Sequence, residues 1–114
     1  MRHYPSDRVD LRSDTVTQPT SEMRKIMSSA IVGDDVLGDD STVNELQEYI
    51  ARILGKEAAL FVPSGTMSNA IAIKSQTKPG DEIVTHKKSH IYLYEGGGYA
   101  SLAGCSVSLV GGNK

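Results

Sequence analysis

The stretch Ala58-Ala59-Leu60-Phe61-Val62-Pro63-Ser64-Gly65-Thr66 decides the fold class of this chain. Its first five residues are an apolar run with the length of a buried strand. Thr66 then opens a helical stretch that continues to about Ser75. A strand that leads directly into a helix is typical of sheets in which the strands run parallel. The junction therefore predicts an α/β fold.

Two helices are predicted before this junction. The first begins near residues 19–21, where Met23, Ile26 and Met27 have helical spacing. The second covers 41–54, where Thr42 and Glu45 form a capping-box pattern. Gly55 supplies the left-handed stop of this second helix. Residues 1–18 have little periodicity, and we expect an extended arm there.

The segment after the junction continues the alternation of strands and helices. Residues 82–85 predict a short strand, and residues 105–110 predict another. Between them, residues 90–102 have a helical pattern that is interrupted by Gly96-Gly97-Gly98. Three strands separated by helices predict a mainly parallel sheet.

Composition excludes several classes of function. The chain has 114 residues, 39% hydrophobic and 23% charged, which is ordinary for one small globular domain. Its net charge is −2, so it has no basic surface for nucleic acid or for a membrane. No apolar stretch has the length of a membrane span.

The cellular location is expected to be cytoplasmic. Cys105 is the single cysteine, so no disulfide can form within the chain, and we interpret it as a small buried residue of an apolar strand. The first residues have no apolar core of a secretory signal, and Asp7, Asp10 and Asp14 disfavour a mitochondrial leader.

The junction Ser64-Gly65-Thr66 has two interpretations. A helix that starts directly after a strand directs free amides and the positive end of its dipole at one point, and the natural ligand there is a phosphate. Gly65 would let a ligand approach the backbone, and Thr66 adds a hydroxyl. The alternative is a plain helix cap without a ligand.

His90 also has two interpretations, as a structural hydrogen-bonding residue or as a catalytic one. No second histidine or cysteine lies near it at metal-ligand spacing, so a zinc site is rejected.

Two further polar segments remain open. Residues 12–17 (Arg-Ser-Asp-Thr-Val-Thr) would close over a site and bind a carboxylate, or would be a solvated arm. Residues 33–40 hold four aspartates without the spacing of an EF-hand, so turn and capping roles are favoured over calcium binding.

Taken in order, these segments resemble the low-specificity L-threonine aldolases, within the superfamily of threonine aldolases and aromatic amino acid β-eliminating lyases. The resemblance covers about residues 8–110. It is carried by Asp10-Leu11-Arg12-Ser13-Asp14-Thr15-Val16-Thr17, Gly33-Asp34-Asp35-Val36, Ser41-Thr42-Val43-Asn44-Glu45-Leu46, Ser64-Gly65-Thr66-Met67-Ser68-Asn69 and Ser89-His90-Ile91-Tyr92 with Glu95-Gly96-Gly97.

The resemblance implies a fold, a cofactor and an activity. It implies the aspartate aminotransferase-like fold (fold type I), with residues 19–114 forming the N-terminal portion of the large domain that binds pyridoxal 5′-phosphate. It implies cleavage of L-threonine and L-allo-threonine to glycine and acetaldehyde, with the cofactor as electron sink. It also implies a homodimer or homotetramer acting on a small amino-acid substrate.

The resemblance assigns roles to four residues. Gly65 and Thr66 would hold the cofactor phosphate, and His90 would stack on the pyridine ring near the substrate hydroxyl. Ser13 would contact the substrate carboxylate. Whether His90 or a water takes the hydroxyl proton stays open, so His90 is a candidate for both a cofactor-binding and a catalytic role.

Two departures from the family are visible. Leu37 stands where the family usually has a tyrosine near the active site. The Schiff-base lysine of the family would lie beyond residue 114. The later strands of its sheet would also lie there, except for residues 105–110, which the resemblance places beside residues 82–85. We therefore expect residues 1–114 alone to be inactive and to be unstable or to aggregate. The alternatives to an aldolase are a non-catalytic truncated product and an unrelated phosphate-binding α/β module.

Overall fold

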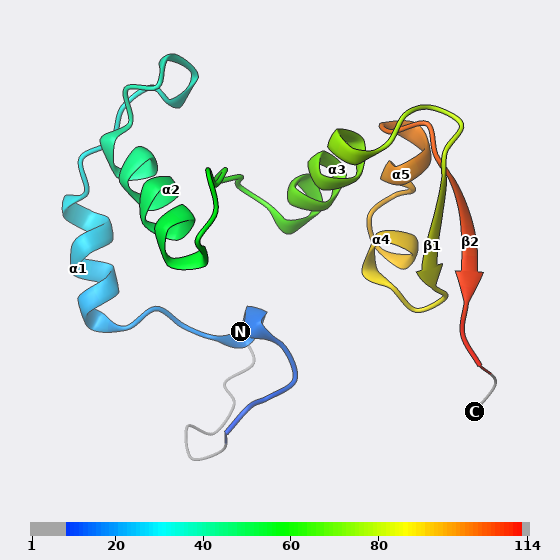
Figure 1. Ribbon diagram of the computed structural model, residues 1–114. Coiled ribbons are helices and arrows are strands. Elements are labelled where there is room, and N and C mark those ends of the chain that lie inside the picture. The colour runs from blue at the N-terminus through cyan, green and yellow to red at the C-terminus, as the bar shows by residue number, and fades with distance from the viewer. Residues whose placement is uncertain (1–8, 113–114) are drawn as a thin grey trace. The chain divides into compact units, whose positions relative to one another are not determined.

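The computed structural model describes residues 9–112 (Figure 1). The chain divides into two compact units, the first ending at Ala59 and the second beginning at Leu60. The first unit is helical, and the second combines helices with a parallel pair of strands. The α/β class predicted from the sequence is confirmed by the second unit. Of the predicted arm, residues 1–8 lie outside the described residues.

In the first unit, helix α1 (Ser21–Ser29) begins where the sequence predicts a helix. Thr20 is its N-cap, because the hydroxyl oxygen of Thr20 accepts a hydrogen bond from the amide of Met23 at 3.2 Å. A short 3₁₀ turn, η1 (Asp14–Val16), precedes this helix.

Helix α2 (Ser41–Leu54) has the predicted bounds but a different cap. The predicted capping role of Thr42 is wrong: Asp40 is the N-cap, and its carboxylate accepts from the amide of Val43 at 2.9 Å. The hydroxyl of Thr42 instead donates to the carbonyl oxygen of Ile31. Since Asp40 directly precedes the first helical turn, it reaches the free amides that Thr42, inside the helix, cannot reach. Gly55 ends the helix with a φ of 60°, as predicted.

The aspartate-rich loop before α2 uses its carboxylates as caps. Asp34 accepts from the amide of Val36 at 2.9 Å and so caps the 3₁₀ turn η2 (Asp35–Leu37). Asp40 also accepts from the amide of Gly33 at 3.1 Å and is 8% exposed. The hydrogen bonds from Val43 and then from Gly33 lower the pKa of Asp40 below its ordinary range. The capping roles favoured from the sequence are thus confirmed for Asp34 and Asp40.

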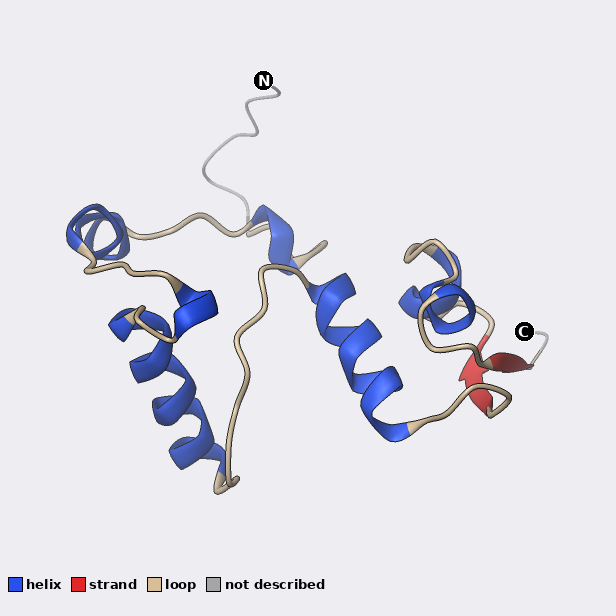
Figure 2. Cartoon of the chain, turned by 90° about the horizontal axis from the view of Figure 1, so that it is seen from above, coloured by secondary structure: helices blue, strands red, loops and turns tan. Residues whose placement is uncertain are grey.

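In the second unit, helix α3 (Gly65–Gln76) leads into strand β1 (Glu82–His86), as Figure 2 shows by helix and strand colour. Two short helices, α4 (His90–Leu93) and α5 (Gly98–Ser101), follow. The predicted interruption of the helical pattern is confirmed, since Gly96 and Gly97 have φ values of 61° and 70°.

Strand β2 (Ser106–Val110) pairs with β1 in parallel. The register runs from Glu82 opposite Ser106 to His86 opposite Val110. The predicted neighbourhood of these two strands and their parallel direction are therefore confirmed.

The predicted strand at 58–62 is wrong for this structure, because no strand is formed there. Leu60 and Phe61 are 68% and 48% exposed. A strand exists only where a second strand completes its hydrogen-bond ladder, and among the described residues the only sheet is the pair of β1 and β2. An apolar run can predict the burial of a strand, but it does not supply a partner.

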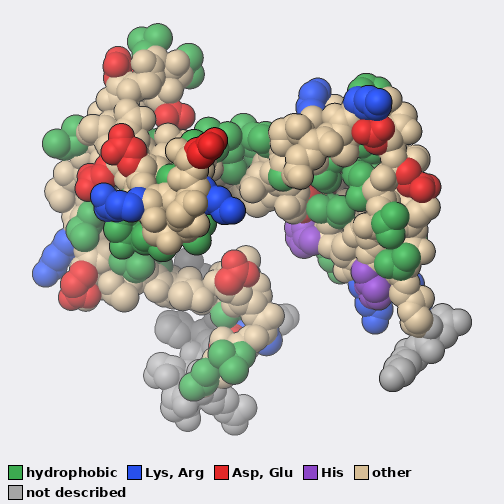
Figure 3. Space-filling model, viewed as in Figure 1, with side chains coloured by type: hydrophobic (Ala, Val, Ile, Leu, Met, Phe, Trp, Pro, Cys, Tyr) green, Lys and Arg blue, Asp and Glu red, His purple; other side chains and the backbone are tan. Residues whose placement is uncertain are grey.

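Few apolar side chains are buried within either unit. Among the described residues, the buried hydrophobic ones are Ala51, Ala103 and Cys105. The interpretation of Cys105 as a buried residue is confirmed, although it lies just before β2, with its thiol donating to Thr77 Oγ1 at 3.2 Å. Figure 3 shows hydrophobic side chains on the surface of both units. In the described part of the chain, no helix has both the length and the apolar character to cross a membrane.

Substitutions at Asp40 and Thr42 separate the observed cap from the predicted one. In Asp40→Ala, the amides of Val43 and Gly33 lose their acceptor, so we expect their hydrogen exchange to become faster by on the order of fivefold. In Thr42→Ala, exchange at Val43 should stay within about twofold of the unsubstituted chain. The measurement is amide hydrogen exchange by NMR in the protein expressed from its complete coding sequence, and equal effects of the two substitutions would contradict the assignment.

Candidate active site

The start of α3 presents two free backbone amides. Ser64 is the N-cap: its hydroxyl oxygen accepts from the amide of Met67 at 3.1 Å, and its carbonyl oxygen accepts from Ser68 at 3.0 Å. Within residues 9–112, the amides of Gly65 and Thr66 have no hydrogen-bond partner. These amides and the positive end of the helix dipole favour an anion at this point.

Gly65 is not required by the packing of the fold. A Cβ added at Gly65 would meet no atom within 4 Å, and the backbone there has no positive φ. The space beside the helix start is therefore open, and glycine keeps the two amides uncovered. Thr66 and Ser64 also line a mostly apolar pocket of about 400 Å³ that extends along α3 to Lys74.

His90 is held by a buried carboxylate. It is the first residue of α4, and its Nδ1 lies 2.6 Å from Glu95 Oε1. The side chain of Glu95 is 5% exposed, whereas that of His90 is 65% exposed. The ring of His90 also lies beside that of Tyr94, with 5.2 Å between centroids and planes tilted by 47°. One edge of the imidazole is thus fixed by protein while much of the ring stays accessible.

Asn69 links this pair to the helix that carries Gly65 and Thr66. Its Nδ2 donates to the same oxygen, Glu95 Oε1, at 2.7 Å. Reasoning from the sequence missed the roles of Asn69 and Glu95. The available signal was their place in the motifs: Asn69 follows Thr66 by three residues, which puts both on one side of a helix, and Glu95 closes the segment that begins at His90.

Opposing effects set the charge of Glu95. Burial raises the pKa of its carboxyl group, whereas the hydrogen bonds from His90 and Asn69 and the charge of the imidazole lower it. The net pKa lies below the ordinary range of glutamate. Glu95 is therefore ionised at neutral pH and acts only as a hydrogen-bond acceptor.

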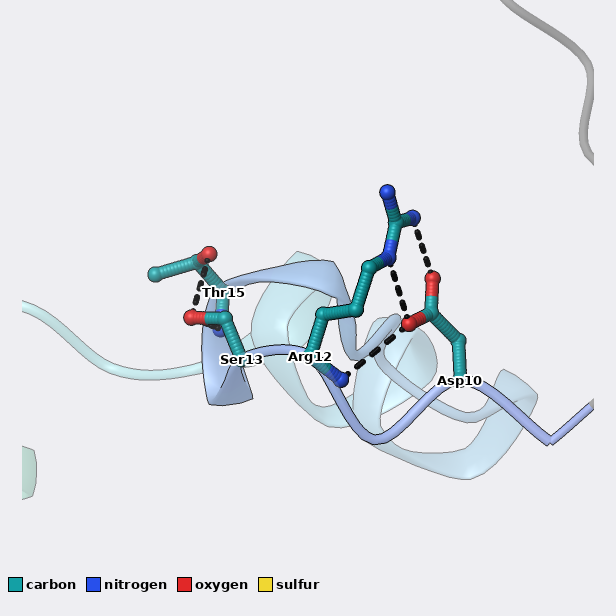
Figure 4. Close-up of polar contacts among 4 residues, drawn as sticks. All are labelled: Asp10, Arg12, Ser13 and Thr15. Atoms are coloured by element: carbon teal, nitrogen blue, oxygen red, sulfur yellow. Dashed lines mark hydrogen bonds and ion pairs between the residues drawn. The ribbon is translucent and has the colours of Figure 1, made fainter.

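Ser13 lies in the first unit, at the start of η1. Its Oγ is 2.9 Å from Thr15 Oγ1 and accepts from the amide of Thr15 at 3.3 Å (Figure 4). The neighbouring Arg12 binds Asp10, with 2.8 Å between Arg12 Nε and Asp10 Oδ1. These hydrogen bonds from the side chain and the backbone of Arg12 lower the pKa of Asp10 to about 2. Ser13 is exposed within its own unit.

Three of the four predicted site residues belong to one unit. Gly65 and Thr66 open α3 and His90 opens α4, and the hydrogen bonds through Asn69 and Glu95 connect the two helices. Ser13 belongs to the other unit, so its place at this site stays a prediction. Among the described residues, no three His, Cys, Asp or Glu side chains gather as a metal site would require.

Known proteins are similar to this chain in sequence. The family model of the β-eliminating lyases matches residues 10–114. The chain is 52% identical over 94 residues to the low specificity L-threonine aldolase of Escherichia coli (strain K12), covering 82% of this chain and 28% of that protein. It is 54% identical over 97 residues to the probable low-specificity L-threonine aldolase 2 of Arabidopsis thaliana, covering 84% of this chain and 27% of that protein.

A third relative is the low specificity L-threonine aldolase of Saccharomyces cerevisiae, 44% identical over 95 residues, with 82% of this chain and 24% of that protein covered. The chain therefore spans about a quarter of the length of these relatives. The family model matches nearly the whole chain, so the chain belongs to the β-eliminating lyase family. The resemblance to low-specificity L-threonine aldolases predicted from the motifs is confirmed.

Replacement of Asn69 tests the balance of effects at Glu95. In Asn69→Ala, the carboxylate loses a donor, so we expect its pKa to rise toward the ordinary value of about 4.3. Because the pKa of Glu95 in the folded state lies below that in the unfolded chain, the ionised carboxylate stabilises the fold at higher pH. This stabilisation is lost as the pH falls through the folded-state pKa. In Asn69→Ala it should be lost at a higher pH than in the unsubstituted protein.

The carboxyl carbon shift of Glu95, followed by NMR as a function of pH in the protein expressed from its complete coding sequence, measures this change. Asn44→Ala is the matched control, because Asn44 donates to the carbonyl oxygen of Gly38 in the first unit. A Glu95 pKa that is unchanged or lower in Asn69→Ala would refute the role of Asn69.

Proposed function

We propose that the protein carrying this chain is a pyridoxal 5′-phosphate-dependent aldolase that cleaves L-threonine and L-allo-threonine to glycine and acetaldehyde. The observation that carries the proposal is the pair of free amides at the start of α3. The same helix carries Asn69, which shares the acceptor Glu95 with His90. Family membership and the relatives named as threonine aldolases support it.

The residues present fit the proposed cofactor. Its phosphate is an anion, and the uncrowded start of α3 offers two amides and the hydroxyl of Thr66. Its pyridine ring is flat and aromatic, and His90 presents an accessible ring whose edge is already held. The fold proposed for the whole protein is that of the aspartate aminotransferase-like enzymes (fold type I), of which this chain forms the N-terminal part of the large domain.

Four residues of the chain have a defined task in this proposal. Gly65 and Thr66 hold the phosphate, and this contact anchors the cofactor. His90 lies against the ring and limits its tilt, near the hydroxyl of the substrate. Ser13 donates a hydrogen bond to the substrate carboxylate. When bound, pyridoxal phosphate supplies an electron sink for the carbanion that remains after the Cα–Cβ bond breaks.

The same proposal extends to assembly and location. We propose a cytoplasmic homodimer or homotetramer with a small amino-acid substrate. Leu37, where the family usually has a tyrosine, is 72% exposed within its own unit. A leucine there offers no hydroxyl to a substrate, so the preference between L-threonine and L-allo-threonine is proposed to differ from that of relatives with tyrosine.

Gly65→Ala tests the phosphate site. The substitution is tolerated by the fold, since the added Cβ meets no atom within 4 Å, but it covers the amides of the helix start. We expect binding of pyridoxal phosphate to the protein expressed from its complete coding sequence to weaken about tenfold. Fluorescence titration measures the affinity, and circular dichroism checks that helix content is unchanged.

Gly98→Ala is the matched control, because Gly98 also opens a helix and its added Cβ meets only Leu102 Cδ1, at 3.8 Å. This control should bind the cofactor as the unsubstituted protein does. Equal binding by both variants would exclude the start of α3 as the phosphate site. Absence of acetaldehyde release from L-threonine and from L-allo-threonine by the loaded, unsubstituted protein would refute the proposed reaction.

Ser13→Ala tests the substrate site. Loss of one hydrogen bond to a carboxylate should raise KM for L-threonine by on the order of tenfold, with a smaller change in kcat and no change in cofactor affinity. Ser28→Ala is the control, because the hydroxyl of Ser28 donates to the backbone of α1. The assay is acetaldehyde release at varied L-threonine, and an unchanged KM would remove Ser13 from the site.

A further inference from the structure

Glu95 is a buried charge for which the proposed function has no task. Its side chain is 5% exposed, and it carries its negative charge at neutral pH because two donors converge on it. Both donors reach the same atom, Oε1, from His90 at 2.6 Å and from Asn69 at 2.7 Å. Burial of a carboxylate is costly unless it is paired and hydrogen-bonded. The contacts with His90 and Asn69 offset this cost, so the three side chains form one hydrogen-bonded cluster.

We propose that Glu95 is a positioning residue that fixes the tautomer and the ring orientation of His90, and that Asn69 connects this pair to the helix that holds the phosphate. The proposal rests on the proposed function for its meaning in catalysis. The arrangement itself involves only residues of this chain.

The tautomer follows from the chemistry of the contact. A carboxylate has no hydrogen to donate, so at 2.6 Å the hydrogen between the two atoms is on Nδ1 of His90. In the neutral ring, Nε2 is then an acceptor and points away from Glu95. A histidine placed against the cofactor and near the substrate hydroxyl therefore presents a hydrogen-bond acceptor on its free edge.

The orientation follows from the link to α3. Asn69 is three residues after Thr66, so its side chain leaves the same side of the helix one turn further on. Its hydrogen bond to Glu95 joins the phosphate-binding helix to the segment between α4 and α5. The spacing between the phosphate and the ring that stacks on the pyridine is thereby set by two hydrogen bonds, from Asn69 and from His90.

His86 provides an internal comparison with the opposite geometry. Its Nδ1 accepts a hydrogen bond from the backbone amide of Lys88 at 3.1 Å. The neutral ring of His86 must then carry its hydrogen on Nε2. Two histidines that are four residues apart are thus predicted to hold opposite tautomers.

The experiment is ¹⁵N NMR of the histidine rings in the protein expressed from its complete coding sequence, without cofactor, at about pH 9, where imidazole is neutral. The signals are assigned with His86→Gln and His90→Gln. We expect His90 mainly as the Nδ1–H tautomer and His86 mainly as the Nε2–H tautomer.

In Glu95→Gln, the side chain keeps its shape and loses its charge, and the ratio of Nδ1–H to Nε2–H at His90 should fall about fivefold. Glu82→Gln is the matched control, because Glu82 accepts from Ser108 at 2.6 Å on the strand pair; the ratio should not change there. Asn69→Ala keeps the carboxylate and should lower the ratio about twofold.

Three results would overturn the proposal. The first is a tautomer ratio at His90 equal to that of a free histidine side chain. The second is a ratio that Glu95→Gln does not change, and the third is one that Glu82→Gln changes equally. An unchanged ratio in Asn69→Ala would show that Asn69 has no part in positioning His90. Because no cofactor or substrate is present, this outcome is independent of the proposed function, which fails instead if the loaded protein does not cleave threonine.

Discussion

The parallel pairing of β1 with β2 is the constraint on which the arrangement of the second unit depends. Parallel strands cannot be joined by a tight hairpin. The chain between His86 and Ser106 must therefore cross over and return to the end of the sheet at which β1 begins. This crossover carries His90, Glu95 and the two short helices. Since α3 leads into β1, the pairing also brings the helix that begins at Gly65 within hydrogen-bonding distance of the crossover, through Asn69.

The candidate site combines an open half and a closed half. The start of α3 is open: its first amides have no partner within residues 9–112, and no neighbouring atom fills the space at Gly65. The imidazole of His90 is bound on one edge by the buried, charged Glu95, and much of the rest of the ring is exposed. Open amides favour an incoming anion, and a fixed ring restricts how that ligand can lie. Both properties suit a flat, phosphorylated cofactor.

Large apolar side chains are exposed on helices and strands of both units. Ile26 is 69% exposed, Leu54 64% and Val84 65%, although all three lie on regular helices or strands. The apolar stripes predict faces that pack, but among the described residues few apolar side chains are buried within either unit. The run at 58–62 is the same case: its residues have the composition of a buried strand, and no described strand lies beside them to form the ladder.

The sequence by itself predicted helices α1 to α3, the stop of α2 at Gly55, the parallel class of the sheet and the family. Helices and strands follow from local rules, because periodicity and turn residues depend on residues close together in the chain. The order of the motifs gave the resemblance to the family, and that resemblance nominated Ser13, Gly65, Thr66 and His90 as candidate site residues. Only the tertiary structure decided that Asp40, rather than Thr42, caps α2, that residues 58–62 form no strand, and that Glu95 and Asn69 hold His90. Each of these depends on which atoms meet across a turn, a sheet or a crossover, and 26 residues separate Asn69 from Glu95. Local patterns cannot determine contacts at that separation, because the intervening strand β1 and its partner set the distance.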